Sequence, residues 1–215
     1  KEFRPDAPAH DLRAELGLAA DAKLIGVVSV LRSWKGHEVL IRAMAELLLE
    51  FPGLYLVIVG EGGQRKNLEE LILQLGLEQH VFLIGHRENV PGILRSLDVL
   101  ALPSVQKEGI PQVILQAFAA GTPVVGTDIG GVREVLTPGR GWIVPPADPD
   151  ALAAAIREVL QRADLAADKT KAALAFVTRE HSEEKMIERT LQVYRGVLDG
   201  SRSASGTGHG ETATR

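Results

Sequence analysis

Residues 102–134 read LPSVQKEGIPQVILQAFAAGTPVVGTDIGGVRE, a stretch in which apolar runs alternate with turn residues. An apolar, strand-like run over residues 98–102 ends at a Pro-Ser pair, and a loop that contains Glu108 and Gly109 follows. Pro111 predicts the start of a helix, because proline is favoured in the first helical turn. The buried face of this helix is expected to carry the apolar residues at helical spacing, which are Val113, Ile114, Ala117 and Phe118.

The start of this predicted helix is a suitable place for a phosphate group. Backbone N–H groups in the first helical turn lack partners within the helix, and the helix dipole adds positive potential there. Gly109, Ile110 and Pro111 form the helix entry, and Gly109 leaves room for an anion. Glu108 and Gln116 are eight positions apart, which corresponds to up to roughly 12 Å along a helix axis. This spacing suits one polar group at each end of a nucleoside diphosphate sugar.

The order and spacing of PS, EG, P, QA, PVV, T and GG within residues 103–134 resemble the donor-site signature of the family 4, or group 1, retaining glycosyltransferases. The resemblance extends from Phe3 to Leu198 and implies the C-terminal, donor-binding half of a GT-B fold. In that family two glutamates separated by seven residues contact the donor sugar and the ribose. The resemblance therefore implies a sugar-contacting, catalytic role for Glu108, whereas Gln116 stands at the second position. An amide can bond a ribose hydroxyl, but it lacks the stronger charge-assisted bond of a carboxylate.

Composition limits the other classes of function. The chain has 215 residues, of which 45% are hydrophobic and 24% charged, enough for one substantial core. A net charge of −4 and the lack of a Lys/Arg cluster argue against nucleic acid as a partner. The sequence has no cysteine, no apolar run of membrane-spanning length and no signal-peptide core at its start, so a cytoplasmic location is expected. The first residue is not Met, which suggests a cut or processed fragment.

Apolar, β-prone runs alternate with helical patterns along most of the chain. Strands are expected near residues 24–30, 54–59, 81–84, 99–102, 124–125 and 142–144. The clearest helices lie at residues 37–50 and 64–75, and others are expected at residues 151–160 and after Ser182. Continuous apolar strands separated by helices predict a single Rossmann-like α/β domain with a parallel sheet of about six strands.

The expected organisation has three parts. An interdomain linker and leading helix occupy residues 1–22, a nucleotide-sugar donor-binding domain residues 23–198, and a disordered, Gly/Ser/Thr-rich tail residues 199–215. A GT-B enzyme has two Rossmann-like domains, and by the resemblance the N-terminal, acceptor-binding domain is missing from this chain. The final helices of the family fold back across that domain. We therefore expect the apolar face that contains Met186 and Tyr194 to be partly exposed.

Arg32 and Lys35 lie in the loop after the first predicted strand. Two cations three residues apart can both face a diphosphate and offset the charge that develops on it as a leaving group. The corresponding residues of the resembling family contact the donor phosphates. The simpler interpretation is a solvated basic loop. Trp34, between the two cations, either covers the site or only packs.

Gly60 and Gly62 follow the second predicted strand and precede a helix, which is the context of a dinucleotide-binding turn, although Arg65 replaces the third glycine. We interpret them as nucleoside-binding, and the alternative is a tight turn without ligand contact. His86 follows the third strand, and by the resemblance the backbone around it meets the base. As a lone loop histidine, it is a weak candidate for a general base.

Two further motifs have a structural alternative. Gly130 and Gly131 precede a helix that contains Glu134, and by the resemblance this turn lies against the donor cleft, whereas the alternative is a structural turn. The Asp-Pro-Asp run at residues 148–150 superficially resembles an Asp-x-Asp metal site, but it is typical of a helix N-cap followed by proline and an acidic first turn. No other group of His, Asp or Glu has ligand spacing, so neither a metal nor a cofactor is predicted.

By the resemblance, the implied function is retaining, metal-independent transfer of a glycosyl group from a nucleoside diphosphate sugar. No nucleophile is evident in this half, and we expect the chain alone to be inactive. The main alternative is a non-catalytic nucleotide-sugar-binding domain, of which Gln116 would be a mark of drift. A sugar-nucleotide epimerase or phosphorylase of related fold is a third interpretation. The nucleotide, the sugar and the acceptor are left open.

Overall fold

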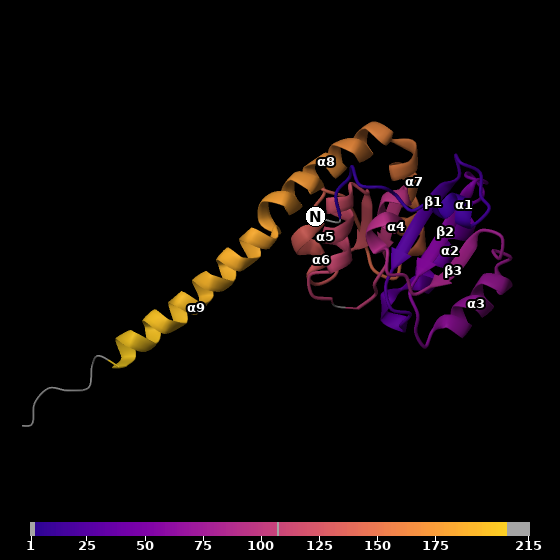
Figure 1. Ribbon diagram of the computed structural model, residues 1–215. Helices are drawn as coiled ribbons and strands as arrows, with labels where there is room; N and C mark the ends of the chain where they lie inside the picture. The colour runs from indigo at the N-terminus through magenta and orange to yellow at the C-terminus, as the bar shows by residue number, and fades with distance from the viewer. Residues whose placement is uncertain (1–2, 107, 206–215) are drawn as a thin grey trace, which may run out of the picture. The chain divides into compact units, whose positions relative to one another are not determined.

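The computed structural model describes residues 3–106 and 108–205. Six strands form one parallel sheet in the order β3-β2-β1-β4-β5-β6. Figure 1 labels β1, β2 and β3 among them. The strands are β1 Lys23–Val28, β2 Leu54–Val59, β3 Val81–Gly85, β4 Val99–Leu102, β5 Val124–Thr127 and β6 Trp142–Val144. The predicted Rossmann-like α/β fold with about six parallel strands is confirmed.

Helices cover both faces of this sheet. In chain order they are α1 Leu12–Glu15, the 3-10 turn η1 Ser33–Lys35, α2 His37–Leu47, α3 Arg65–Gln74, α4 Val90–Ser96, α5 Gln112–Ala120, α6 Val132–Val135, α7 Pro149–Gln161, α8 Ala163–Glu180 and α9 Glu183–Ser205. Helix α2 packs against α3 and α7, whereas α4 packs against α5. Because βαβ crossovers are right-handed and the strand order reverses at β1, these two groups of helices lie on opposite faces.

Burial on both faces explains why the strand sequences are continuously apolar. Every residue of β4 and β5 is buried, and so are the central residues of β1. Two-sided burial removes the apolar-polar alternation that a half-exposed strand shows. The neighbouring helix α2 adds buried side chains at helical spacing, which are Val39, Leu40, Ala43, Met44 and Leu47.

Capping residues set several helix ends as the sequence predicts. The Asp148 side chain accepts a hydrogen bond from the Ala151 N–H at 2.9 Å, with Pro149 in the first turn of α7, so the N-cap interpretation of this motif is confirmed. Helix α5 begins one residue after Pro111 and ends at Gly121, whose φ of 75° suits a residue without a side chain.

Two helices of the structure, α4 and α8, had no bounds predicted from the sequence. Helix α4 carries Pro91 and Gly92 in its first turn, a pair that in sequence is typical of a turn. Helix α8 is rich in Ala and charged residues and has few large apolar side chains, which gives it a weak amphipathic pattern. The helix expected at residues 37–50 ends earlier, at Leu47.

Contacts divide the chain into two compact units, one ending at Ala175 and the other beginning at Phe176. This boundary falls within α8, and the extent predicted for the donor-binding domain, residues 23–198, stays a prediction. The leading segment belongs to the first unit, because Arg13 of α1 donates to the Ser96 carbonyl at 2.8 Å and to the Asp98 carboxylate at 2.7 Å.

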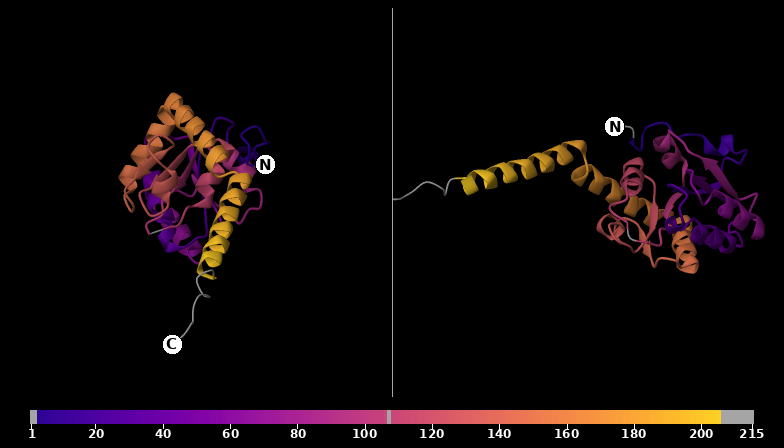
Figure 2. Two further views of the ribbon diagram at one scale, coloured as in Figure 1. Left: turned by 90° about the vertical axis from the view of Figure 1, so that its left-hand side faces the viewer. Right: turned by 90° about the horizontal axis from the view of Figure 1, so that it is seen from below.

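In the second unit, α9 is one continuous helix, drawn in yellow in Figure 2. Its apolar side chains are exposed as expected, with Met186 62% and Tyr194 65% accessible. Residues 199–205, the start of the predicted tail, extend α9, because each residue added to an existing helix gains a backbone hydrogen bond, and the disorder of this tail stays a prediction. Residues 206–215, the rest of that predicted tail, lie outside the described part. Across residues 3–106 and 108–205, no helix has both the length and the apolar character needed to cross a bilayer.

Candidate functional site

The predicted site residues gather at one edge of the sheet. The strand order reverses between β1 and β4, and in open α/β sheets ligands bind outside the carboxyl ends of the strands at such a reversal. Arg32 and Lys35 follow β1, and Glu108 follows β4. The loops after β2, β3 and β5 carry the remaining predicted residues of this edge, which are Gly60, Gly62, His86, Gly130 and Gly131.

Lys35 and Glu108 form an ion pair across the reversal point. The Lys35 Nζ lies 2.9 Å from both carboxylate oxygens of Glu108. The two side chains are only 18% and 12% exposed. From the sequence, Lys35 is predicted to contact the diphosphate and Glu108 the sugar, and the structure brings the two side chains into direct contact.

A second partner of Glu108 was missed in the sequence. The Ser104 hydroxyl donates to the Oε1 of Glu108, and Ser104 is fully buried. The Thr127 hydroxyl at the end of β5 donates in turn to the Ser104 carbonyl at 2.6 Å. A polar residue at the end of each of two adjacent parallel strands was the available signal, because such ends meet at one edge.

The loops after β1 and β4 are interlocked. Gly36 has a φ of 69°, and a Cβ at this position would overlap the Pro103 carbonyl oxygen. The Val105 N–H donates to the Trp34 carbonyl at 2.8 Å. The loop that carries Lys35 is therefore fixed directly against the loop that leads to Glu108.

The loop after β5 supports the backbone of Glu108. The Gly131 N–H donates to the Glu108 carbonyl at 2.9 Å. A Cβ on Gly131 would lie 2.5 Å from the carbonyl carbon of Gly109. This close approach explains the need for glycine at position 131 and supports the structural interpretation of the turn, while Glu134 lies exposed on α6, the helix that follows.

Arg32 is exposed and lies near Lys35 in sequence without sharing its ion pair. Its guanidinium stacks over the Trp34 ring, with Cζ 4.9 Å from the ring centroid. Trp34 therefore supports Arg32, which is a third role beside the two considered from the sequence. An exposed guanidinium held by a ring is accessible to an anion.

His37, the first residue of α2, is a buried polar residue that the sequence analysis did not single out. It is 2% exposed, and its Nε2 lies 3.0 Å from the Ser29 hydroxyl at the end of β1. Burial, with a further contribution from the positive charge of Lys35, lowers the pKa of His37 from 6.5 to about 4. The imidazole is therefore neutral near pH 7 and adds no cation to this edge.

Gly60 and Gly62 are explained by packing within the chain. Their φ angles are 139° and 157°, and a Cβ would overlap the Ser29 carbonyl oxygen at Gly60 and lie 2.5 Å from the Leu31 carbonyl oxygen at Gly62. The turn after β2 thus approaches the segment after β1 closely. This supports the alternative of a structural turn, and a nucleoside contact stays a prediction.

His86 is exposed at the end of β3, after Gly85 with a φ of 76°. The next residue, Arg87, donates to Glu15 at 2.6 Å and so ties this loop to α1. The contact of the His86 backbone with a base stays a prediction.

The entry of α5 differs in one respect from the expectation. Gly109 and Ile110 are exposed, whereas Pro111 is buried and has no N–H to offer a phosphate. Amides from Ile110 and from the first turn of α5, at Gln112 and Val113, are the available donors. Gln116 lies half-buried on the same helix. Within the helix, Ile114, Ala117 and Phe118 are buried as predicted, and Val113 is half-buried.

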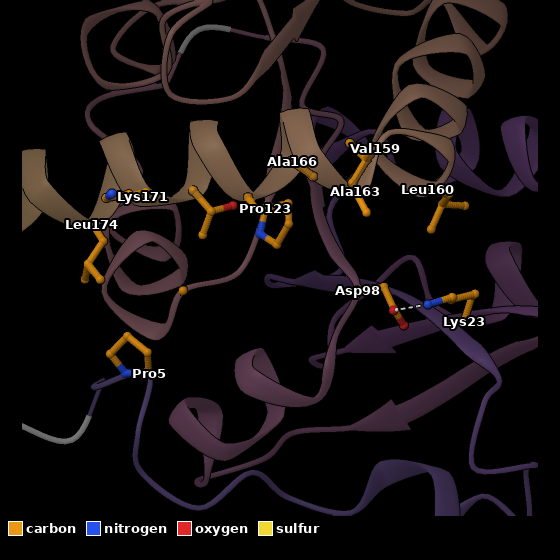
Figure 3. A pocket seen from close by; sticks show the side chains of 13 residues that line it. Pro5, Lys23, Asp98, Pro123, Val159, Leu160, Ala163, Ala166, Lys171 and Leu174 are labelled. Carbon is orange, nitrogen blue, oxygen red and sulfur yellow. Dashed lines mark hydrogen bonds and ion pairs between the residues drawn. The ribbon is translucent and has the colours of Figure 1, made fainter.

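A separate cavity of about 530 Å³ lies at the opposite edge of the sheet (Figure 3). Lys23 and Asp98, at the starts of β1 and β4, lie in its lining, and their charged groups pair with each other at 3.0 Å. Most of the remaining lining is apolar, with Pro123, Val159, Leu160 and Ala166 as examples. None of the predicted site residues lines this cavity. Within the described residues, no group of three or more His, Cys, Asp or Glu is placed to hold a metal ion.

The family model described as glycosyl transferases group 1 matches residues 9–176 of the chain. A curated relative, the D-inositol 3-phosphate glycosyltransferase of Corynebacterium urealyticum, is 32% identical over 92% of this chain and 49% of its own length. The chain thus spans about half the length of the curated relatives it matches.

Solved structures of glycosyl transferases and related proteins are similar to this chain in fold. The Anabaena protein Alr3699/HepE in complex with UDP has a TM-score of 0.81 and 28% identity, covering 86% of this chain and 51% of its own. The C-terminal domain of the group 1 glycosyl transferase LpcC from Francisella tularensis shares the fold, with a TM-score of 0.72 and 22% identity over 84% of this chain and 96% of that domain.

Proposed function

The chain belongs to the group 1 glycosyl transferases, and from this we propose that it binds a nucleoside diphosphate sugar as the donor half of a retaining, metal-independent glycosyltransferase. The observation that carries the proposal is the pairing of Lys35 with Glu108 at the reversal of strand order. A cation for phosphate and a carboxylate for sugar hydroxyls occur there side by side. A nucleoside diphosphate sugar needs both groups close together, because its diphosphate is bonded directly to its sugar.

The diphosphate is assigned to the cationic loop and to the entry of α5. Lys35 and the accessible guanidinium of Arg32 provide positive charge. Amides at Ile110 and in the first turn of α5 provide N–H donors near the positive end of the helix dipole, and Gly109 leaves room for the anion. Charge and donors fixed in advance stabilise the negative charge that develops on the departing diphosphate.

The sugar and the nucleoside are assigned to either side of the diphosphate. The Glu108 carboxylate accepts hydrogen bonds from sugar hydroxyls, and Gln116 bonds the ribose. Backbone near Gly60, Gly62 and His86 contacts the nucleoside. The Anabaena protein Alr3699/HepE, at 28% identity and with the same fold, is in complex with UDP, which supports a nucleotide as the ligand of this chain.

An acceptor-binding domain completes the enzyme in this proposal. The coverage of about half of the length of the Corynebacterium and Anabaena proteins supports it. The residue that faces the anomeric carbon from the other side would come from that domain. A cytoplasmic location stays a prediction.

Calorimetric titration tests the proposal with UDP, GDP, ADP and dTDP, and with UDP-glucose and GDP-mannose. We expect at least one nucleoside diphosphate to bind with a much lower Kd than its free nucleoside, and no glycosyl transfer by the chain alone. Failure of every diphosphate to bind would overturn the proposed donor site. Robust turnover by the 215-residue chain would overturn its role as half of an enzyme.

The alternative of a non-catalytic nucleotide-sugar-binding domain is favoured by one observation, the amide of Gln116 at the position where the family has a glutamate. A two-domain protein that contains this chain separates the two functions. Slow hydrolysis of the bound donor by such a protein supports the enzyme, whereas tight binding with no donor turnover supports the binding domain.

A further inference from the structure

Glu108 is held by groups from its own loop, after β4, and from the loops after β1 and β5. Lys35 after β1 contacts both carboxylate oxygens at 2.9 Å, and Ser104 after β4 donates its hydroxyl to Oε1. Gly131 after β5 holds the Glu108 backbone carbonyl at 2.9 Å. The two side-chain partners of Glu108 differ in one respect. Lys35 is also assigned to the diphosphate in the proposed function, whereas the Ser104 hydroxyl is assigned only to Glu108.

Ser104 is better fixed than Lys35. It is fully buried, and the Thr127 hydroxyl bonds its carbonyl at 2.6 Å. On either side, the Pro103 carbonyl lies against Gly36 and the Val105 N–H bonds the Trp34 carbonyl at 2.8 Å. The Ser104 hydroxyl therefore projects from a backbone that two adjacent elements hold in place.

We propose that Ser104, fixed through Thr127, is a positioning residue that holds the Glu108 carboxylate in the orientation that contacts the glycosyl group of the donor. The inference rests on the proposed function of this site. When Lys35 turns toward the diphosphate, Glu108 loses one partner. Ser104 remains, and its hydrogen bond to a carboxylate is of the stronger, charge-assisted kind. Ser104 thus acts on the sugar through Glu108 and not on the nucleotide.

The test compares Kd values for a nucleoside diphosphate and its sugar, measured by calorimetry on the full chain. The probes are the diphosphate among UDP, GDP, ADP and dTDP that binds the unmodified chain and its nucleotide sugar, such as UDP-glucose or GDP-mannose. We expect Ser104→Ala to weaken binding of the nucleotide sugar about fivefold to tenfold. Its affinity for the diphosphate alone should stay within about twofold of that of the unmodified chain.

Ser96→Ala is the matched control. Ser96 is also buried, and its hydroxyl donates to the Ile93 carbonyl at 2.6 Å near the opposite edge of the sheet. Both substitutions remove one buried hydroxyl, so a similar decrease in Tm is expected for each. The ratio of the Kd of the diphosphate to the Kd of its nucleotide sugar measures the contribution of the sugar. Only Ser104→Ala should lower this Kd ratio.

A double variant tests whether Ser104 acts through Glu108. In Glu108→Gln the Kd ratio should fall as well, and adding Ser104→Ala should change it little further, since residues that act on one contact are not additive. Equal losses for diphosphate and sugar in Ser104→Ala, an unchanged ratio, or full additivity would each overturn the positioning role while the donor site stands. Failure of the unmodified chain to bind any of UDP, GDP, ADP and dTDP would overturn both.

Discussion

Replacing Glu108 with Gln tests whether the ion pair between Lys35 and Glu108 must break before Lys35 can bind a diphosphate. The Lys35 Nζ is 2.9 Å from both oxygens, and the two side chains are 18% and 12% exposed. At an effective dielectric constant of about 20, unit charges roughly 4 Å apart attract by about 4 kcal/mol. The cost of taking both charges out of water offsets most of this attraction. Separating the pair should therefore cost about 1 kcal/mol net, discounted for the solvent that still reaches it.

Glu108→Gln removes that cost, because the amide keeps a hydrogen bond to Lys35 without the charge. We expect UDP or GDP, whichever binds, to bind about fivefold more tightly by calorimetry. The corresponding nucleotide sugar should gain less, since it loses its contact with the carboxylate. Glu70→Gln is the control, because it removes the same charge from an exposed side chain of α3, and its Kd should be unchanged. An unchanged or higher Kd for the diphosphate in Glu108→Gln would refute the competition between carboxylate and phosphate for Lys35.

Other substitutions test the remaining parts of the site. Gln116→Glu should strengthen nucleotide binding by about 1 kcal/mol through a charge-assisted bond to the ribose, and calorimetry with a dideoxyribose diphosphate should show no gain. Arg32→Ala should weaken diphosphate binding by about 1.5–3 kcal/mol and leave the Kd of the free nucleoside nearly unchanged, so equal losses would contradict a phosphate contact. The free energy of unfolding should fall as pH falls from about 6.5 to about 4, because the lowered pKa of His37 lets the unfolded chain bind a proton that the folded chain does not. Denaturant titrations at pH 4.5 and 7 give the difference in the free energy of unfolding between the two pH values. In His37→Gln this difference should be smaller by up to about 3 kcal/mol, and an unaltered difference would contradict the burial argument.

The parts of the fold that depend on local sequence were predictable. The strands at Leu54–Val59, Val99–Leu102 and Trp142–Val144 have the expected bounds, because two-sided burial makes their apolar runs continuous. Asp148 and Pro149 mark the start of α7 by local capping chemistry. Helix α8 escaped prediction, since its alanine-rich sequence has a weak amphipathic pattern.

The site itself was only partly predictable, because its contacts depend on strand order. Lys35 and Glu108 are 73 residues apart, and they meet only because β1 and β4 are neighbours in the sheet. Each residue was a candidate by itself, but no spacing in the sequence joins them. The same holds for Gly60 and Gly62, whose packing against the segment after β1 follows from the pairing of β1 with β2.

The contact of Gly36 with the Pro103 carbonyl has a consequence for engineering the two segments that carry Lys35 and Glu108. Two segments that are distant in sequence share one surface with no space between them, so neither can be redesigned alone. A graft that replaces residues 30–36 with those of a relative keeps its geometry only if residues 103–110 come from the same parent. Recombination libraries that place a crossover between these segments should lose more members to misfolding than libraries that inherit both segments together.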